Sequence, residues 1–148
     1  MADTQSYSNH TRWNPLFHFI LMPLLVLNLL SHLVRLFLAA PESGRKALAF
    51  WVVLSFALIL LALASRMQAL KAQDRTIRLE ERLRYRELLS PELAQKAADL
   101  PVGQIIALRF ASDEELADLA QQVLDGKLTN QKEIKMAVKN WRPDHHRV

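Results

Sequence analysis

Hydrophobic positions fall in two long runs within the first half of the chain, whereas the second half mixes apolar and charged residues at helical spacing. The runs cover residues 16–38 and 47–64. At about 1.5 Å of rise per residue they give roughly 34 Å and 27 Å of helix, against a hydrocarbon core of about 30 Å. The pattern predicts two transmembrane helices, with the lipid bilayer as a partner of the chain.

The connector between the runs, residues 39–46, reads AAPESGRK. Pro41 ends a helix and Gly44 permits a tight reversal, so the two runs are predicted to form a hairpin. A cleaved secretory signal is the alternative for the first run, because residues 38–40 resemble a small-residue cleavage site. The run is too long for a signal and Arg35 interrupts its end, which favours a retained membrane helix.

Residues 65–89 contain neither proline nor glycine. The second run is therefore predicted to continue as a long juxtamembrane stalk helix. Opposite charges at i,i+4 spacing, Asp74 with Arg78 and Glu80 with Arg84, are expected to support it. Its basic residues also suit a helix held near anionic lipid headgroups.

Apolar residues of the stalk occupy two faces of the expected helix. The first face carries Met67, Leu70 and Ile77, and the second carries Ala72, Leu79 and Leu83. Two apolar faces indicate packing against more than one neighbour.

Residues 90–148 carry start and stop signals for short helices. Ser90 followed by Pro91 is typical of a helix start, and that helix is expected to end before Pro101. Another turn of helix is predicted for residues 103–110.

Two capping boxes predict the remaining helices. SDEE, residues 112–115, begins a helix that stops near Gly126. Asn130 with Glu133 begins a last helix, which is expected to extend to Trp141 because its apolar residues share one face up to that position.

Together these elements predict an all-α chain with a two-helix transmembrane hairpin, a long juxtamembrane helix and a small cytoplasmic helical cluster. The expected segments are an N-terminal segment at 1–15, transmembrane helices at 16–38 and 47–64, an external connector at 39–46, a stalk at 65–89 and a helical domain at 90–148. Basic residues are more numerous beside the outer ends of the runs than in the connector, which predicts that both termini face the cytoplasm.

Composition removes several classes of function. The 148 residues include no cysteine, which excludes disulfides, thiolate metal sites and cysteine nucleophiles. The three glycines are scattered and form no phosphate-binding loop, and no Ser, His and Asp arrangement has the spacing of a hydrolase motif. The sequence therefore predicts a protein without enzymatic activity.

The first apolar run carries side chains that hydrocarbon disfavours. At 100° per residue they lie on one side of the helix and form a polar stripe. The members of the polar stripe are Asn14, His18, Asn28, Ser31, His32 and Arg35. Unpaired polar groups in lipid are costly, and the second run offers only Ser55 and small alanines, so the stripe predicts an intramembrane contact with a second copy or another membrane protein.

Two other interpretations of the polar stripe stay open. His18 and His32 lie about 21 Å apart along the helix axis, so paired histidines of a dimer could hold haem, or single histidines a chlorophyll-type pigment. A proton or ion path is the other, although the two runs contain no Asp or Glu. Since the neighbouring residues equally suit packing, interhelical hydrogen bonding without a cofactor is the favoured interpretation.

Basic residues mark the last predicted helix and its end: Lys132, Lys135, Lys139 and Arg142. Together with the helix before it, this segment has the outline of a helix-turn-helix, which would make a membrane-tethered nucleic-acid-binding protein. The preceding helix is acidic and the net charge is only +4, so a solvated basic face is favoured over nucleic-acid binding. These four residues are predicted to contact a cytoplasmic partner.

Asp144, His145 and His146 look like metal ligands. Adjacent residues near a chain end do not set up tetrahedral coordination without ligands from elsewhere, and His10 is the nearest candidate in type. No metal site is predicted.

Four phrases of the chain resemble a bacterial membrane-protein family known as domain of unknown function 6526. They are QSYSNHTRWNPLFHFILMPLL (5–25), AQDRTIRLEERLR (72–84), IALRFASDEEL (106–116) and KEIKMAVKNWRPDHHRV (132–148). The resemblance runs over nearly the whole chain and implies a small bacterial protein with two membrane helices and a helical cytoplasmic tail. It implies no activity, cofactor or catalytic residue.

These observations lead to one expectation about function. The chain is predicted to be a multi-pass protein of the bacterial inner membrane that acts as a non-catalytic interaction or assembly subunit. Its partners would be further copies of itself or other subunits of a membrane complex, because both halves expose more one-sided polarity or apolar surface than the chain alone satisfies.

Overall fold

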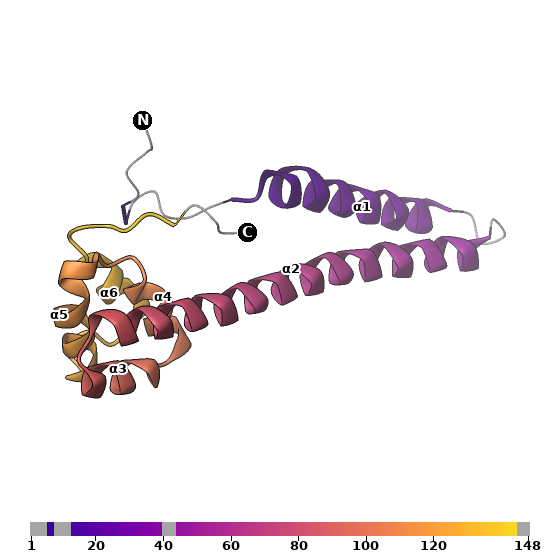
Figure 1. The fold of residues 1–148 in the computed structure, drawn as a ribbon. Coiled ribbons are helices and arrows are strands. Elements are labelled where there is room, and N and C mark those ends of the chain that lie inside the picture. The colour runs from indigo at the N-terminus through magenta and orange to yellow at the C-terminus, as the bar shows by residue number, and fades with distance from the viewer. Residues whose placement is uncertain (1–5, 8–12, 40–43, 145–148) are drawn as a thin grey trace. The chain divides into compact units, whose positions relative to one another are not determined.

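Helices account for nearly all of the regular structure in the computed structural model, which describes residues 6–7, 13–39 and 44–144 (Figure 1). In chain order they are η1 (Leu16–Leu21), α1 (Met22–Leu38), α2 (Arg45–Leu88), α3 (Pro91–Ala98), α4 (Val102–Leu108), α5 (Asp113–Leu124) and α6 (Gln131–Ala137). The all-α prediction is confirmed for these residues. The chain divides into one unit of Trp13–Leu70 and another of Lys71–Val148 with Met1–Arg12.

The first helical stretch opens with a π-helical turn, η1, just before Pro23. The Met22 N–H donates to the Phe17 carbonyl, which lies five residues back instead of the four of an α-helix. Proline has no N–H, and its ring collides with the carbonyl four residues back in a regular α-helix. The wider turn is a way for the chain to accommodate Pro23 while it remains helical from Leu16 to Leu38.

Helix α2 runs without interruption from Arg45 to Leu88. The second apolar run and the stalk are thus one helix, as the lack of proline and glycine predicts. This helix and the helical stretch Leu16–Leu38 each contain a long apolar segment. Both helices are long and apolar enough to cross a membrane.

The apolar side chains of these two helices lie mostly on the surface of the chain. In the most apolar 18-residue segment of each helix, 0% of the residues are buried for Leu16–Leu38 and 6% for α2. A core helix of a water-soluble domain would have most of its apolar face buried. Exposure on this scale distinguishes the two helices from such core helices.

The second unit has its own hydrophobic core, formed where α3 to α6 gather around the C-terminal end of α2 (Figure 1). Tyr85 from α2 and Leu108 from α4 are fully buried there. Helix α5 supplies much of the remainder, with Leu116, Leu119, Ala120 and Val123 all buried. The helical cluster expected for the region after residue 90 is therefore confirmed.

Helix starts in the second unit follow the capping signals. The Ser90 hydroxyl accepts from the Leu93 N–H at the start of α3, and a capping box begins α6. At the start of α5 the Glu115 carboxylate accepts from the Ser112 N–H. Gly126 adopts the left-handed conformation, with φ of +73°, just after the end of α5. That conformation disfavours side chains with a Cβ, which explains glycine at this stop.

The last helix is shorter than the sequence predicts. Helix α6 ends at Ala137 and Val138 is extended, whereas the apolar spacing predicts helix as far as Trp141. The Lys139 and Asn140 N–H groups donate to the Glu115 carboxylate instead, and Trp141 forms an antiparallel bridge with Ala111. Tertiary acceptors thus replace helical ones, while Val138 and Trp141 still pack on the core.

Candidate functional site

Asn28 of the polar stripe meets the second apolar helix within the same chain. Its side-chain Nδ2 donates to the Ser55 hydroxyl oxygen of α2 at 2.8 Å. The Ser55 hydroxyl in turn donates to the Trp51 carbonyl at 2.7 Å, and Ser55 is 2% exposed. The serine that the second run offers therefore accepts one N–H of Asn28 within the chain.

His32 also lies against the second apolar helix. Its imidazole stacks on the Trp51 ring, with centroids 5.9 Å apart and an interplanar angle of 13°. The His32 Nδ1 atom is buried and has no hydrogen-bond partner among the described residues. One polar atom in this part of the stripe therefore stays unsatisfied within the described chain.

Asn14 and His18 form a local polar group at the start of the first helix. The Asn14 side-chain oxygen accepts from the Phe17 N–H at 3.1 Å, in the manner of a helix cap. The His18 Nδ1 atom lies 2.9 Å from the Asn14 carbonyl oxygen, and its ring packs edge-on against Trp13 and Phe17. These contacts are those of an ordered helix end.

Ser31 and Arg35, the remaining members of the polar stripe, are exposed. The structure thus brings Asn28 and His32 to the second helix, keeps Asn14 with His18, and leaves Ser31 and Arg35 at the surface. Both histidine rings pack on aromatic side chains, which is what ordinary helix packing provides. The haem or pigment interpretation gains no support from these contacts.

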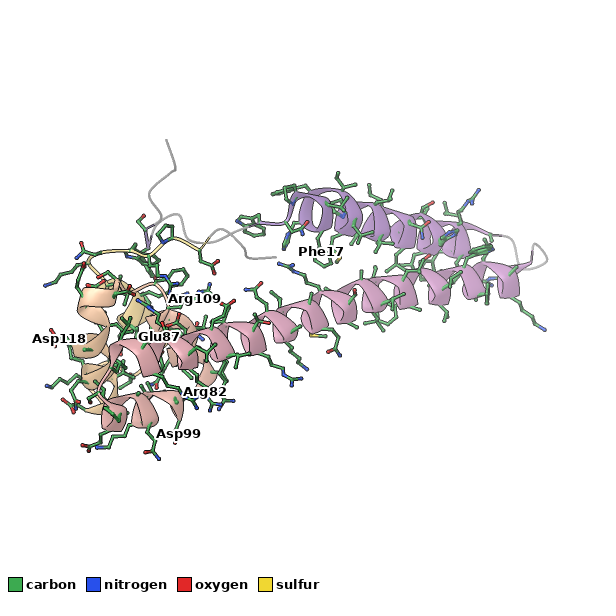
Figure 2. The ribbon with its side chains drawn as sticks, in the orientation of Figure 1. Phe17, Arg82, Glu87, Asp99, Arg109 and Asp118 are labelled. Atoms are coloured by element: carbon green, nitrogen blue, oxygen red, sulfur yellow. The ribbon has the colours of Figure 1, made fainter. Side chains whose placement is uncertain are left out.

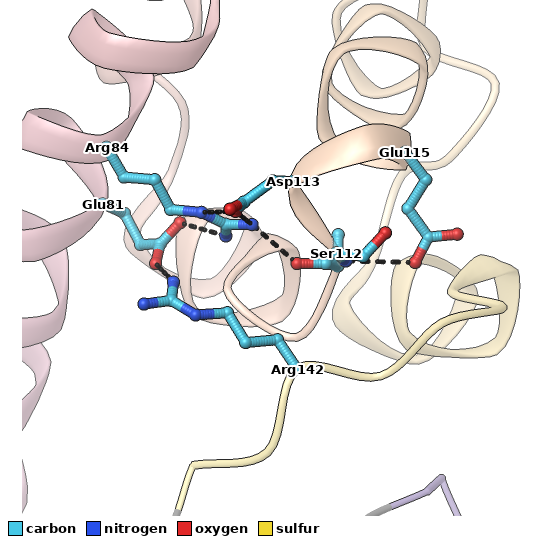
Figure 3. A network of polar contacts seen from close by, with 7 residues as sticks. Glu81, Arg84, Ser112, Asp113, Glu115 and Arg142 are labelled. Carbon is cyan, nitrogen blue, oxygen red and sulfur yellow. Dashed lines mark hydrogen bonds and ion pairs between the residues drawn. The ribbon is translucent and has the colours of Figure 1, made fainter.

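A second polar constellation lies in the helical cluster, where Arg84 of α2 connects three elements (Figure 3). Its Nη2 donates to the Asp113 carboxylate at 2.6 Å and to the Ala111 carbonyl at 2.8 Å. Its Nη1 lies 3.2 Å from a Glu81 carboxylate oxygen. Arg84 is 8% exposed and pairs with Glu81 and Asp113, so the predicted Glu80–Arg84 pair is replaced by contacts toward the core.

Glu81 is the acidic centre of this network. It is 4% exposed, and its second carboxylate oxygen lies 3.4 Å from the Arg142 Nη1 atom. Burial raises the pKa of the Glu81 carboxyl above its ordinary value, and this effect exceeds the opposite effect of Arg84 and Arg142. The network therefore holds a carboxylate whose ionisation is costly relative to the unfolded chain.

A cavity of about 340 Å³ adjoins the network. Its walls are Glu80, Glu81, Arg84, Arg109, Arg142, Pro143 and Asp144. Arg109 pairs with Asp144 at 3.3 Å and lies over the Phe110 ring. Since three arginines face three acidic residues there, the wall has no excess positive charge for an anion, and its arrangement suits a structural connection between α2 and the C-terminal segment.

Local spacing in the sequence does not identify this network, because Asp113 lies 29 residues from Arg84 and Arg142 lies 61 residues from Glu81, and the Glu81–Arg84 contact alone is local. The sequence does contain one indication of the network, because arginines and carboxylates occur on the same side of the stalk helix as Ile77 and Tyr85. That side is buried against the cluster.

The four basic residues predicted for a cytoplasmic contact do not form one helix face. Lys132 and Lys135 lie on α6, whereas Lys139 and Arg142 follow its end. The Lys135 ammonium lies 5.6 Å from the centre of the Phe110 ring, and Arg142 pairs with Glu81. The helix-turn-helix outline is therefore not supported, because its second helix is short and lacks two of the four residues.

The histidines considered as metal ligands, His10, His145 and His146, lie outside the described residues. Asp144, which was grouped with them, pairs with Arg109.

The chain belongs to a family of unknown function, DUF6526, whose model matches residues 1–148. The resemblance drawn from the four sequence phrases is thereby confirmed. No curated protein and no solved structure matches the chain.

Proposed function

We propose that this protein is an integral membrane protein that acts as a non-catalytic interaction or assembly subunit, either of a homo-oligomer or of a larger membrane complex. We place it in the bacterial inner membrane, with Leu16–Leu38 and the first part of α2 as its two spans and with both termini in the cytoplasm. The helical cluster then offers a folded surface to cytoplasmic partners.

One observation carries the proposal. Large apolar side chains along both long helices are exposed to a degree that water would penalise, and Phe37 and Leu61, for example, are 77% and 65% exposed. Each buried leucine-sized side chain contributes about 2 kcal/mol, so lipid or protein contact along both helices is strongly favoured. A bilayer is the environment that supplies such contact for helices of this length.

The polar stripe supports a protein neighbour in addition to lipid. Ser31 and Arg35 are exposed on α1, where a neighbouring helix can reach them. Arg35 lies near the end of its helix and can extend to the membrane surface. Ser31 lies one turn deeper, where a hydrogen bond to another helix is the favourable alternative to lipid.

The test uses the absence of cysteine in the native chain. Ser31→Cys is compared with Leu30→Cys, which lies at nearly the same depth but faces away from the polar stripe. Both variants are treated in native membranes with a short thiol-to-amine crosslinker and with a thiol-to-thiol crosslinker. We expect the protein to resist alkaline extraction and Ser31→Cys to be captured in complexes that Leu30→Cys does not form. A protein that leaves the membrane on alkaline washing would contradict the membrane assignment. Equal, background capture at both positions would contradict the intramembrane contact.

A further inference from the structure

The face of α2 that points away from the helical cluster carries exposed leucines. Leu79 and Leu83 are 61% and 52% exposed, whereas Ile77 on the opposite face is 6% exposed. The sequence predicts two apolar faces on the stalk. In the second unit Ile77 of the first face is buried, whereas Ala72, Leu79 and Leu83 of the second face are all exposed. We call the open face, with its members Ala72, Thr76, Leu79 and Leu83, the stalk seam.

The stalk seam has the spacing of a coiled-coil core. Its residues follow one another at intervals of four, three and four, which are the alternating a and d positions of a heptad. Thr76 and Leu83 then occupy a positions and Ala72 and Leu79 d positions. All four are exposed.

Charges beside the stalk seam identify the partner and its direction. Arg75 and Arg82 occupy the g positions, and Glu80 and Glu87 occupy the e positions five residues later. In a parallel pair of identical helices each g residue meets the e residue five positions on in the other chain, which gives Arg75 with Glu80 and Arg82 with Glu87. An antiparallel pair would bring arginine to arginine and glutamate to glutamate instead.

We propose that the stalk seam binds a second copy of this chain, in parallel, through Ala72–Leu83 of α2. This inference rests on the proposed function, because anchoring in one membrane with one orientation aligns the two stalks and raises their effective concentration. The seam spans barely two heptads, and Arg86 at the next d position ends it, so the pairing depends on that anchoring. The complementary charges specify a second copy over an unrelated helix.

Of the flanking charges, Arg75 and Glu80 have exposed side chains. Arg84 binds Glu81 and Asp113, which leaves the exposed Glu80 outside its hydrogen bonds. Arg82 already donates to the Ala98 carbonyl at the end of α3, and its Nη2 atom lies 3.9 Å from the Asp99 carboxylate. Figure 2 labels Arg82, Asp99 and Glu87. Arg75 with Glu80 is therefore the pair that matters more.

The first experiment is disulfide formation between single cysteines of the full-length protein in native membranes. Leu79→Cys and Ala72→Cys place one thiol on the stalk seam, and Lys71→Cys, next to Ala72 but facing away from the seam, is the matched control. In a parallel pair each seam cysteine lies opposite itself, so we expect disulfide dimers for Leu79→Cys and Ala72→Cys at about tenfold the yield of the control. These positions are exposed, so folding of the cluster does not depend on them.

The second experiment tests the charges in the Leu79→Cys background. Arg75→Glu replaces attraction by repulsion on both sides of the symmetric pair and should lower the disulfide yield about tenfold. Adding Glu80→Arg restores complementary pairs and should restore the yield. Lys71→Glu, an equal charge change off the seam, should leave it unchanged.

Different failures have different meanings. Equal disulfide yields from Leu79→Cys and Lys71→Cys overturn the stalk pairing. A disulfide between Leu79→Cys and a different protein also overturns it, as does a Leu79→Cys yield that stays the same after Arg75→Glu and Glu80→Arg. If Ser31→Cys still enters complexes in that case, the proposed intramembrane contact survives without the stalk pairing. If the protein leaves the membrane on alkaline washing, the proposed function is wrong. A disulfide between stalk seams of the released protein would then support the stalk pairing independently of membrane anchoring.

Discussion

Arg84 illustrates how tertiary packing changes the partners that helical spacing predicts for a charged residue. The spacing predicts a pair with Glu80, whereas the Arg84 guanidinium donates to the buried Glu81, three residues away, and to Asp113 at the start of α5. Hydrogen bonds to a charged guanidinium are stronger where water is excluded. The sequence does not specify this choice, because Asp113 approaches Arg84 only through the packing of α5.

Replacing Arg84 by methionine should lower the free energy of unfolding of the second unit by about 3 kcal/mol, because Glu81 and Asp113 lose a buried partner while the aliphatic stem is kept. Lys132→Met, on the exposed surface of α6, serves as the control and should cost no more than about 0.5 kcal/mol. Native-state hydrogen exchange of the α5 amides measures both values. Equal costs for the two variants would show that the Arg84 network adds nothing to stability.

Glu81 gives the network a defined pH dependence. Its folded pKa is raised by burial, so between its unfolded and folded pKa values the folded state binds more protons than the unfolded chain. The stability contribution of Glu81 is thus fully present below the unfolded pKa of about 4.3 and is lost as the pH rises through the raised pKa. We expect the stability of Glu81→Gln relative to the native protein to improve as the pH increases from about 4.5 toward neutrality, as measured by hydrogen exchange of α5. A difference that is constant with pH, or that changes in the opposite direction, would contradict the raised pKa.

At the scale of helices, starts are easier to predict from sequence than ends and irregular turns. Capping side chains next to the helix specify the starts of α3, α5 and α6. The end of α6 depends on Glu115, twenty or more residues earlier in the chain, and so has no local signal. The π-helical turn has a local cause in Pro23, which has no backbone N–H. The absence of that one donor does not by itself predict whether the helix will kink or widen into a π-helical turn.

Glu115 connects the start of α5 to the segment that follows α6. Its carboxylate accepts from the Ser112, Lys139 and Asn140 N–H groups. Glu115→Ala leaves these donors without their acceptor and should cost about 2 kcal/mol, with exchange of the Lys139 and Asn140 amides accelerated by about tenfold or more.

Glu114→Ala is the matched control for that change. Glu114 is an exposed acidic residue in the same first turn of α5, so it shares the favourable interaction with the helix dipole but none of the three Glu115 bonds. Its removal should leave the exchange of Lys139 and Asn140 unchanged. Similar acceleration in both variants would mean that the charge near the helix start, and not the bonding of Glu115, holds the C-terminal segment.

At the scale of the whole molecule, the distribution of apolar residues was enough to predict two long apolar helices and a separate helical cluster. The two units of the structure divide at residues 70 and 71, inside the helix that the sequence predicts to join membrane and cytoplasm. What the apolar pattern does not specify is the partner of each face. Asn28 reached Ser55 within the chain, and the leucines of the stalk seam lie exposed.

Membrane orientation is the property of the whole chain that the charge distribution predicts most directly. Arg66, Lys71, Arg75 and Arg78 follow the second span closely, whereas Arg35, Arg45 and Lys46 lie on the connector side. Because basic residues near a span are retained in the cytoplasm, the connector should be the external segment. Lys46→Cys and Lys132→Cys each replace one exposed lysine by the only thiol of the chain.

In cells whose outer membrane has been made permeable, a maleimide that does not cross the inner membrane should label Lys46→Cys and should reach Lys132→Cys only after the inner membrane is opened. Lys46→Cys removes a basic residue from the connector side and therefore favours the predicted orientation, whereas Lys132→Cys leaves the charges beside both spans unchanged and tests the orientation without that bias. Labelling of Lys132→Cys with protection of Lys46→Cys would reverse the topology. It would also move the helical cluster and the stalk seam to the opposite side of the membrane, where a cytoplasmic partner could not reach them.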